Sequence, residues 1–398
     1  MAGVAPTFLI KVFPPMEKCL AVILLLSLLM AAPLTFAQAP QVARTPPMGW
    51  NSWNLFACKV SDAVVRAAAD SMASNGMKDA GYAFINIDDC WQGKRDAQGN
   101  IQGNERFPNM KALSDYVHSK GLKIGIYSSP GPKTCAGYEG SYQHEEQDAR
   151  SYAAWGFDYL KYDWCSASEV YKISDMPAIY KKMGDALQAT GRPIVFSLCQ
   201  YGVNSVWTWG ARAGGNLWRT SGDISANYES ILALGFAQNP GLERYAGPSH
   251  WNDPDMLEVG NGKLTLNENR LHFSLWSLLA APLLAGNDLA HMNPEVLGVL
   301  INPEVIAIDQ DPLGVQGHRL WEEGPIDVWV KPLADGSKAV GIFNKGDPQD
   351  PVTIQFREIG VGKSARIRDL WEHKDLGHFE GSFTANVPAH GVVLLHVL

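Results

Sequence analysis

The sequence predicts an α/β fold: a (β/α)8 TIM barrel over residues 44–314 and a C-terminal antiparallel β-sandwich domain over residues 315–398. Between Met48 and Ile308, about eight short apolar segments alternate with helical patterns, and that number favours a closed barrel. Short apolar strands in such an alternation are typical of a parallel sheet covered by helices. After about Gly314 the helical patterns stop, and strands between Gly, Pro and Asp turns replace them.

The elements of the barrel carry separate sequence signals. Ser61 is a typical N-terminal cap, and we expect its helix to run to about Lys78 because apolar side chains recur on one face. An open doubly wound sheet is the alternative, but no glycine-rich phosphate-binding turn follows the first strand. The later strands are expected at 82–87, 122–127, 157–162, 194–198 and 217–219, and helices at 110–120, 147–155 and 177–190.

The C-terminal domain is expected to be small and free of helices. Residues 327–330, 339–343 and 392–397 are apolar runs between turn-forming residues, which is typical of strands. A domain of about 80 residues with this pattern indicates a sandwich packed against the barrel.

The N-terminus has the pattern of a secretory signal peptide. The apolar run at 20–32 follows two lysines and, at about a dozen residues, is shorter than the roughly 20 needed to cross a membrane. The small-x-small sequence at 35–37 resembles a cleavage site, so residues 1–37 are expected to be removed from a secreted or periplasmic protein. An uncleaved anchor is the alternative, and translation from Met16 instead of Met1 would give a more usual leader.

The charge and composition exclude several classes of function. The 33 basic and 41 acidic residues give a net charge of −8, and no block of Lys or Arg occurs. Such a chain has no electrostatic basis for binding nucleic acid. Beyond the N-terminal run, no stretch is long and apolar enough to span a membrane, so no membrane association is expected after cleavage.

The cysteines and histidines do not indicate a metal site. Of the six cysteines, Cys19 lies in the leader, and the odd remainder suggests two disulfides and one free thiol whose pairing stays open. No C-x-x-C spacing occurs, and the ten His residues show no metal-ligand pattern. H-E-x-x-H, G-x-S-x-G and phosphate-loop motifs are also missing from the sequence. We therefore expect no metal and no organic cofactor.

Acidic residues recur at the ends of the predicted strands, where barrels of this kind collect functional side chains. Hydrolysis of a glycosidic bond needs one carboxylate that attacks the anomeric carbon or activates water, and another that protonates the leaving oxygen. Each residue alone could equally cap a helix, close a turn or form an ion pair at the rim. The residues at these ends are Asp88, Asp89, Lys161, Asp163, Arg219, Asp223, Asp253 and Asp255.

Seven motifs follow one another along the chain: TPPMGWNSW at 45–53, IDDCW at 87–91, GIY at 125–127, KTCAG at 133–137, KYDWC at 161–165, WRTSGD at 218–223 and WNDPDM at 251–256. They resemble, in the same order, the motifs of α-galactosidases of glycoside hydrolase family 27, and the similarity covers nearly all of residues 44–398. The family fold, a (β/α)8 barrel with a C-terminal antiparallel β-domain, agrees with the fold that the sequence patterns predict. The resemblance implies retaining hydrolysis of terminal α-D-galactose from oligosaccharides or galactomannan, with a carbohydrate as the partner.

The resemblance also implies a role for each residue of the site. Asp163 resembles the nucleophile that forms a covalent glycosyl-enzyme, and Asp223 resembles the general acid and later general base. The disulfides implied are Cys58–Cys90 and Cys135–Cys165. The sugar-binding residues implied are Asp88 and Asp89 at the 4- and 6-hydroxyls, Trp53 as an aromatic wall, and Tyr127, Lys161 and Arg219 as polar lining.

These roles carry geometric expectations. The two reacting carboxyls should stand about 5–5.5 Å apart if the anomeric configuration is retained. Lys161 precedes Asp163 by two residues on one strand, so its side chain should point to the same face and help to keep Asp163 ionised. Asp223 must hold a proton at rest, so we expect it to be buried beside its carboxylate neighbour.

One segment departs from the family pattern. After the fifth strand the chain has Gln200 and Tyr201 where many of these enzymes have Glu and Trp, with the Glu near the sugar's 2-hydroxyl. Gln200 keeps the length of Glu but not its charge, which leaves the specificity at this position open. A β-L-arabinopyranoside is the alternative substrate, and an α-N-acetylgalactosaminide would need a smaller residue. A non-catalytic sugar-binding protein is the alternative from another functional class.

Overall fold

The computed structural model describes residues 1–5, 9, 42–348 and 350–398. The segment expected as a signal peptide, including its cleavage site at 35–37, lies largely outside these residues. Residues Gln41–Leu398 form one compact unit. Among the residues described, no helix combines the length and the apolar character needed to cross a bilayer.

Eight parallel strands form the first sheet, in the order β7-β6-β5-β4-β3-β2-β1-β8. A bridge between Leu257 and Ala285, with Leu257 N–H donating to Leu284 at 2.8 Å, links the chain after β7 to β8 and closes the barrel. The predicted TIM barrel is therefore confirmed. The strands are β1 (Met48–Asn51), β2 (Phe84–Asn86), β3 (Lys123–Ser128), β4 (Tyr159–Tyr162), β5 (Val195–Leu198), β6 (Leu217–Arg219), β7 (Trp251–Asp253) and β8 (Leu283–Ala285).

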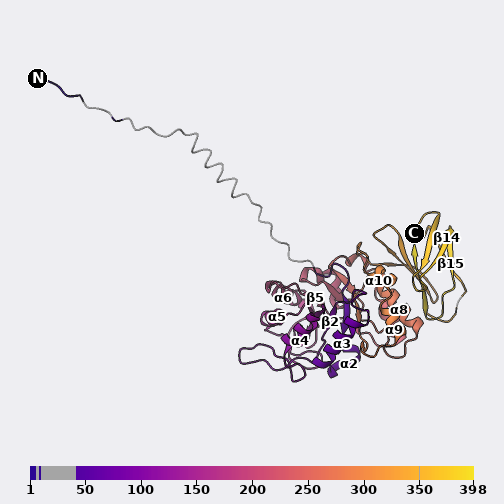
Figure 1. Ribbon diagram of the computed structural model, residues 1–398, viewed down its shortest axis with the longest axis horizontal. Helices are drawn as coiled ribbons and strands as arrows, with labels where there is room; N and C mark the ends of the chain where they lie inside the picture. Colours follow the sequence, from indigo (N-terminus) through magenta and orange to yellow (C-terminus); the bar gives the residue numbers. More distant parts are fainter. Residues whose placement is uncertain (6–8, 10–41, 349) are drawn as a thin grey trace. The chain divides into compact units, whose positions relative to one another are not determined.

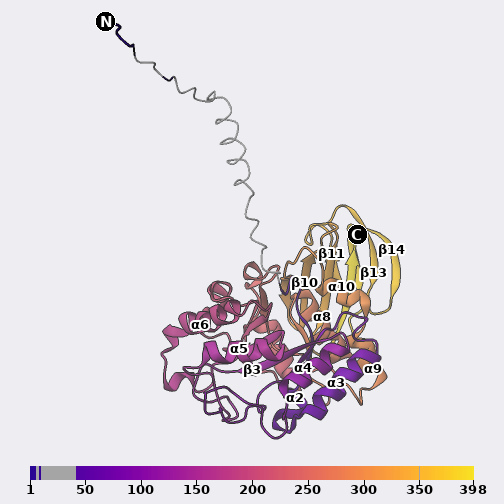
Figure 2. The same ribbon diagram turned by 60° about the vertical axis from the view of Figure 1, so that its left-hand side comes forward.

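Helices cover the outside of this sheet, and Figure 2 shows α3, α4, α5 and α6 in succession along it. Ser61 caps α3 as predicted, accepting a hydrogen bond from Val64 N–H. The helix ends at Ser74 rather than near Lys78, because the chain turns at Gly76, whose φ of +95° no helix allows. The helices are α2 (Trp53–Phe56), α3 (Asp62–Ser74), α4 (Met110–Ser119), α5 (Glu145–Trp155), α6 (Met176–Ala189), α7 (Tyr228–Ile231), α8 (Leu266–Leu278), α9 (Pro294–Leu300) and α10 (Pro303–Asp309).

The C-terminal domain is the predicted antiparallel sandwich, drawn in yellow around β14 and β15 in Figure 1. One sheet has six strands in the order β14-β13-β16-β11-β10-β9, and the other pairs β12 with β15. Apolar side chains such as Val328, Ile342 and Ile354 form its core. The strands are β9 (His318–Glu323), β10 (Ile326–Pro332), β11 (Lys338–Asn344), β12 (Val352–Gln355), β13 (Ser364–Asp369), β14 (Lys374–Glu380), β15 (Ser382–Ala385) and β16 (Gly391–Val397).

A buried lysine joins the sandwich to the barrel. Lys331 on β10 is 0% exposed, and its amine donates hydrogen bonds to the carbonyls of Ser277 at 3.2 Å, Ile308 at 2.5 Å and Asp309 at 3.4 Å. These carbonyls lie at the C-terminal ends of α8 and α10, where the helix leaves them without internal partners and where a cation is favourable.

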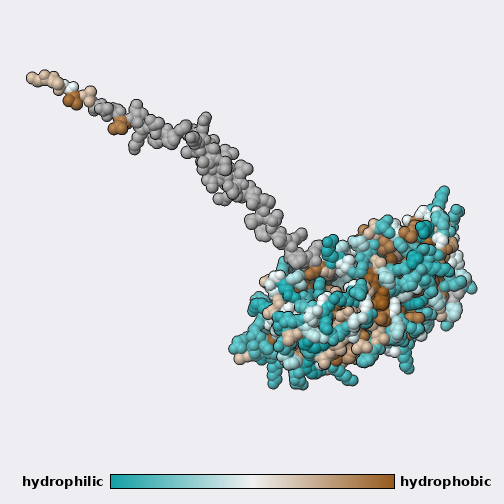
Figure 3. Space-filling view, in the orientation of Figure 1, coloured by the Kyte–Doolittle hydropathy of each residue, from teal (hydrophilic) through white to brown (hydrophobic). Residues whose placement is uncertain are grey.

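The visible outer face is predominantly hydrophilic, with apolar side chains lying among the polar ones (Figure 3).

Candidate active site

A pocket of about 310 Å³ lies where the barrel strands end. Eight of the nine site residues expected from the sequence line it; the exception is Gln200. Since parallel strands end at one mouth of a barrel, residues far apart in the sequence meet there. The pocket is lined by Trp53, Asn54, Asp88, Asp89, Tyr127, Cys135, Lys161, Asp163, Tyr201, Arg219, Asp223, Ile224, Ser225, Ala226, Asp255, Met256 and Glu258.

Asp163, the residue after β4, presents a buried carboxylate to the pocket and is 4% exposed. Its Oδ1 accepts hydrogen bonds from Trp164 N–H at 2.8 Å and from the Tyr201 hydroxyl at 2.6 Å. Its Oδ2 accepts one from the Tyr127 hydroxyl at 3.0 Å. Burial raises the pKa of the Asp163 carboxyl above its ordinary value, while the charge of Lys161 and these donors act in the opposite direction.

Lys161 on β4 pairs with Asp88 at the end of β2. Its amine donates to Asp88 Oδ2 at 2.8 Å, and Asn51 donates to the same oxygen at 2.8 Å. Burial by itself lowers the pKa of Lys161, but the nearby carboxylates, with Asp88 first, raise it well above its usual value. Lys161 therefore remains a cation beside the two acidic residues that follow β2.

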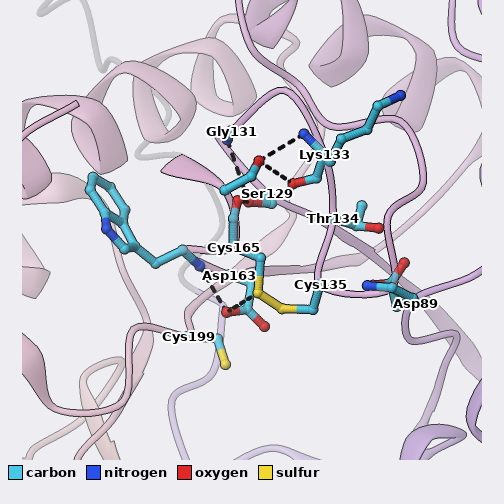
Figure 4. The surroundings of a disulfide bond; sticks show 12 residues. Asp89, Ser129, Gly131, Lys133, Thr134, Cys135, Asp163, Cys165 and Cys199 are labelled. Atoms are coloured by element: carbon cyan, nitrogen blue, oxygen red, sulfur yellow. Dashed lines mark hydrogen bonds between the residues drawn. A yellow bond between two sulfur atoms is a disulfide. The ribbon is translucent and has the colours of Figure 1, made fainter. Parts of the chain in front are cut away.

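Both oxygens of Asp89 are held by backbone N–H groups next to disulfides. Oδ1 accepts from Cys90 at 2.6 Å, and Oδ2 accepts from Ala136 at 2.8 Å. Cys90 is bonded to Cys58, and the disulfide Cys135–Cys165 adjoins Ala136, so the structure has both disulfides that the family resemblance implied. Figure 4 shows Asp163 and Asp89 beside the Cys135–Cys165 bond.

Asp223 lies at the mouth of the pocket, and its side chain is 70% exposed. The expectation that Asp223 would be buried is wrong, because the segment after β6 carries its carboxylate outward to the rim. The guanidinium of Arg219, which is itself buried, contacts Asp223 Oδ1 at 3.2 Å and Asp255 Oδ2 at 2.9 Å. Burial alone lowers the pKa of Arg219, but the charge of Asp255 more than reverses this effect.

Gln200 does not reach the pocket, contrary to the expectation from the sequence. It is 0% exposed, and neither amide atom has a hydrogen-bond partner among the residues described. Gln200 lies in the turn after β5, where Tyr201 has φ +62°, and its two neighbours make the contacts toward the site instead. Cys199 contacts the Arg219 guanidinium at 3.7 Å, and Tyr201 lines the pocket. In the part of the chain described, Cys199 is the cysteine left outside a disulfide.

Two further acidic residues, Asp255 and Glu258, also line the pocket. From the sequence, Asp255 could be either a site residue or a turn former. Its carboxylate pairs with the Arg219 guanidinium and accepts a hydrogen bond from the N–H of Ile224 at 2.8 Å. Glu258 was missed because it lies five residues beyond β7, outside any strand-end pattern. It accepts from Asn54 at 2.8 Å and Asn261 at 2.6 Å, and burial raises the pKa of Glu258 to about 7.

The ligand atoms of Cys135, Asp163 and Cys165 lie within 4.8 Å of one another, which is close enough for a metal site. The two sulfurs are bonded to each other, so they offer no thiolates to a metal ion. What the pocket can do chemically rests instead on two carboxylates: a buried one that can attack, and one at the mouth that can exchange protons with a leaving group or water.

The class of protein follows from these features. A (β/α)8 barrel whose strand ends bring carboxylates, a lysine and an arginine to one pocket has the parts of a glycoside hydrolase. Residues 45–311 match the family described as alpha galactosidase A, and residues 323–397 match the alpha galactosidase C-terminal beta sandwich domain. The chain belongs to this melibiase family, glycoside hydrolase family 27.

Similarity to individual relatives extends over most of the chain. The alpha-galactosidase A of Cellvibrio japonicus is 45% identical over 397 residues, which cover 93% of this chain and 96% of the relative. The alpha-galactosidase of Cyamopsis tetragonoloba is 46% identical over 355 residues, covering 88% of this chain and 85% of the relative. The solved structure of the Saccharomyces cerevisiae α-galactosidase with raffinose is 30% identical, has a TM-score of 0.84 and covers 90% of this chain and 98% of its own.

Proposed function

We propose that this protein is a retaining exo-α-galactosidase that removes terminal α-D-galactose from oligosaccharides or galactomannan. The observation that carries the proposal is that Asp163 and Asp223 line one pocket, the first buried and held by three donors, the second exposed at the mouth. The names of the relatives support galactose as the sugar.

The reaction proceeds by double displacement. Asp163 attacks C1 of galactose while Asp223 gives its proton to the glycosidic oxygen, so the bond from C1 to that oxygen breaks and a glycosyl ester forms. Asp223 then takes a proton from water, the water oxygen bonds to C1, and the ester releases the Asp163 carboxylate. The exposed position of Asp223 suits both steps, because leaving group and water pass through the mouth.

The remaining lining residues bind the sugar. Asp88 and Asp89 are fixed acceptors for the 4- and 6-hydroxyls, and Lys161 keeps the first of them charge-compensated. Trp53 supplies an apolar face for the pyranose ring. One guanidinium nitrogen of Arg219 contacts both Asp223 and Asp255, so Arg219 bridges these carboxylates and gives this part of the pocket a polar surface.

The test is hydrolysis of 4-nitrophenyl α-D-galactopyranoside followed by NMR. We expect α-galactose as the first product, and Asp163→Asn to lose at least about a thousandfold in kcat. A β-configured first product, or sugar binding without turnover by the wild-type protein, contradicts the proposal.

A panel of three chromogenic substrates tests the sugar. The α-galactoside is expected to be cleaved faster than the β-L-arabinopyranoside, which lacks the 6-CH2OH group and so leaves one carboxylate of the Asp88–Asp89 pair without a partner. The α-N-acetylgalactosaminide is expected to react slowest, because Tyr201 occupies the side of the pocket beside the nucleophile. If the arabinopyranoside is cleaved fastest, galactose is not the preferred sugar and this part of the proposal is wrong.

We also propose that the protein is exported, with residues 1–37 as a cleaved signal peptide. The apolar run at 20–32 and the two disulfides support this, since disulfides persist in oxidising compartments. N-terminal sequencing of the mature protein from the native host is expected to begin at Gln38; an N-terminus at Met1 or Met16 would contradict cleavage.

A further inference from the structure

The three hydrogen-bond donors on Asp163 are divided unequally between its two oxygens. Oδ1 accepts from the hydroxyl of Tyr201 and from the N–H of Trp164, whereas Oδ2 accepts from the hydroxyl of Tyr127. We propose, building on the proposed function of Asp163, that Tyr201 is a positioning residue that keeps Oδ1 as the spectator oxygen, so that Oδ2 forms the bond to the sugar. Oδ2 carries one donor, and its remaining lone pair is free to attack.

The turn that carries Tyr201 holds this side chain in one place. Tyr201 has φ +62°, a left-handed conformation that residues other than glycine rarely adopt, and Gly202 follows with φ +75°. A Cβ atom on Gly202 would come within 2.5 Å of the carbonyl oxygen of Thr220, so the turn packs closely against the chain after β6. Backbone strain of this kind persists where the surroundings enforce it, and it clusters at functional sites.

The Tyr201 hydroxyl is enclosed between the nucleophile and a disulfide. Its oxygen lies 3.7 Å from Cys135 Sγ and 3.6 Å from Cys165 Sγ, and the Arg219 guanidinium lies 5.8 Å from the ring centre. Bonded sulfurs carry no hydrogen, so the hydroxyl has no donor facing it there and directs its own proton to Asp163. Burial and the charge of Asp163 raise the pKa of Tyr201, which keeps that proton in place.

The two steps of the reaction use this hydrogen bond differently. When Oδ2 bonds to C1, the negative charge leaves Asp163, Oδ1 becomes the ester carbonyl, and the charge-assisted bond from Tyr201 weakens. When water bonds to C1 and gives its proton to Asp223, the bond from C1 to Oδ2 breaks and its electron pair returns to the Asp163 carboxylate. Tyr201 then stabilises the charge that develops on Oδ1. Its hydroxyl therefore assists release of the sugar more than the first attack.

Other ionisable side chains also act on Asp163, and all of them remain when the Tyr201 hydroxyl is removed. They are Lys161 on β4, Tyr127 on β3, Tyr180 on α6 and Cys199 after β5, while Asp223 lines the same pocket. A change of pH profile in Tyr201→Phe therefore reports the lost hydrogen bond. Since that bond favours the ionised carboxylate, its loss moves the acid limb of kcat/KM to higher pH.

The experiment compares wild type, Tyr201→Phe and Tyr171→Phe. Tyr171 is a half-buried tyrosine whose ring lies 6.4 Å from that of Trp164, and it makes no hydrogen bond to Asp163 among the described residues, so it controls for loss of a nearby hydroxyl. For Tyr201→Phe we expect kcat to fall about 10- to 100-fold with a lower KM, as the glycosyl-enzyme accumulates. The acid limb of kcat/KM is expected to move to higher pH, while Tyr171→Phe keeps the wild-type profile.

An unchanged acid limb in Tyr201→Phe overturns the inference, whether or not kcat falls, because lost packing alone would not move that limb. A fluorinated galactosyl inactivator separates this result from the proposed function. If peptide mass spectrometry finds the ester on a residue other than Asp163, the proposed function fails. If the ester is on Asp163, a crystal structure of the trapped enzyme is expected to show the Tyr201 hydroxyl on the ester carbonyl oxygen. The Tyr201 hydroxyl on the oxygen bonded to C1 would overturn the assignment of Oδ1.

Discussion

The amine of Lys161 donates its hydrogen bond to Asp88, at 2.8 Å, and not to Asp163 on its own strand. Lys161 therefore compensates the charge of Asp88 directly, and it acts on Asp163 through space. With the roles proposed above, one cation thus serves both the sugar-binding end and the reacting end of the pocket.

Replacing this cation should impair both ends. In Lys161→Met, Asp88 is left as a buried carboxylate without its charge partner, and we expect kcat/KM for an α-galactoside to fall about 100-fold or more. The acid limb of the pH profile should also move to higher pH, because the charge of Lys161 lowers the pKa of Asp163. Steady-state kinetics check both effects, with the exposed Lys111→Met as the matched control. A Lys161→Met enzyme with unaltered KM and pH profile would show that the pairing is structural only.

The pH dependence of activity follows from the burial of Asp163. Asp163 must be ionised to attack, and burial raises its pKa, so activity is lost as the pH falls through a value above the ordinary Asp value of about 3.9. We expect kcat/KM to fall in this way on the acidic side of neutral. An alkaline optimum without an acid limb would refute the roles of the two carboxyls.

The disulfide Cys135–Cys165 should matter for sugar binding more than for overall folding. It fixes the loop whose Ala136 N–H donates to Asp89 at 2.8 Å. In the double variant Cys135→Ser/Cys165→Ser we expect KM to rise about tenfold, since Asp89 loses a fixed charge-assisted donor. Measuring KM and the melting temperature together separates the two effects. A large fall in Tm with unchanged KM would assign the bond to stability alone.

Stability should depend on pH through His272, a fully buried residue of α8. Its Nε2 accepts the N–H of Glu258 at 3.0 Å, and burial lowers the pKa of His272 to about 3. The unfolded chain takes up this proton near pH 6.5 and the folded chain does not, so acid favours unfolding. His272 alone should remove about 2 kcal/mol of the free energy of unfolding between pH 7 and pH 5.

Denaturant unfolding of wild type and His272→Gln at several pH values checks this contribution. Glutamine can place an acceptor near the position of Nε2 but does not titrate, so the variant should lose less stability toward pH 5. Equal pH slopes for the two proteins would mean that His272 is protonated in the folded state as well.

Sequence patterns predict the barrel well because its strands are short, apolar and separated by amphipathic helices. They also predict which residues meet at the pocket, since strand ends converge in a closed barrel. They fail where a loop sets the direction of a side chain: Asp223 is carried to the rim, and the turn after β5 keeps Gln200 out of the pocket. Glu258 lines the pocket but follows no strand end, so no local sequence signal points to it. In the sandwich, β14 is rich in charged and exposed residues, so its apolar alternation is weak.

Lys331 of the sandwich donates hydrogen bonds to carbonyls at the ends of α8 and α10 of the barrel. The two family matches are separated at residues 311–323, but dividing the chain there would break these buried contacts. A barrel expressed alone would expose the carbonyls at the ends of two helices, and a sandwich expressed alone would expose an amine that is buried and hydrogen-bonded in the whole chain. A chimera that takes its C-terminal domain from another member of the family must therefore contain both the lysine and the helix ends that it contacts.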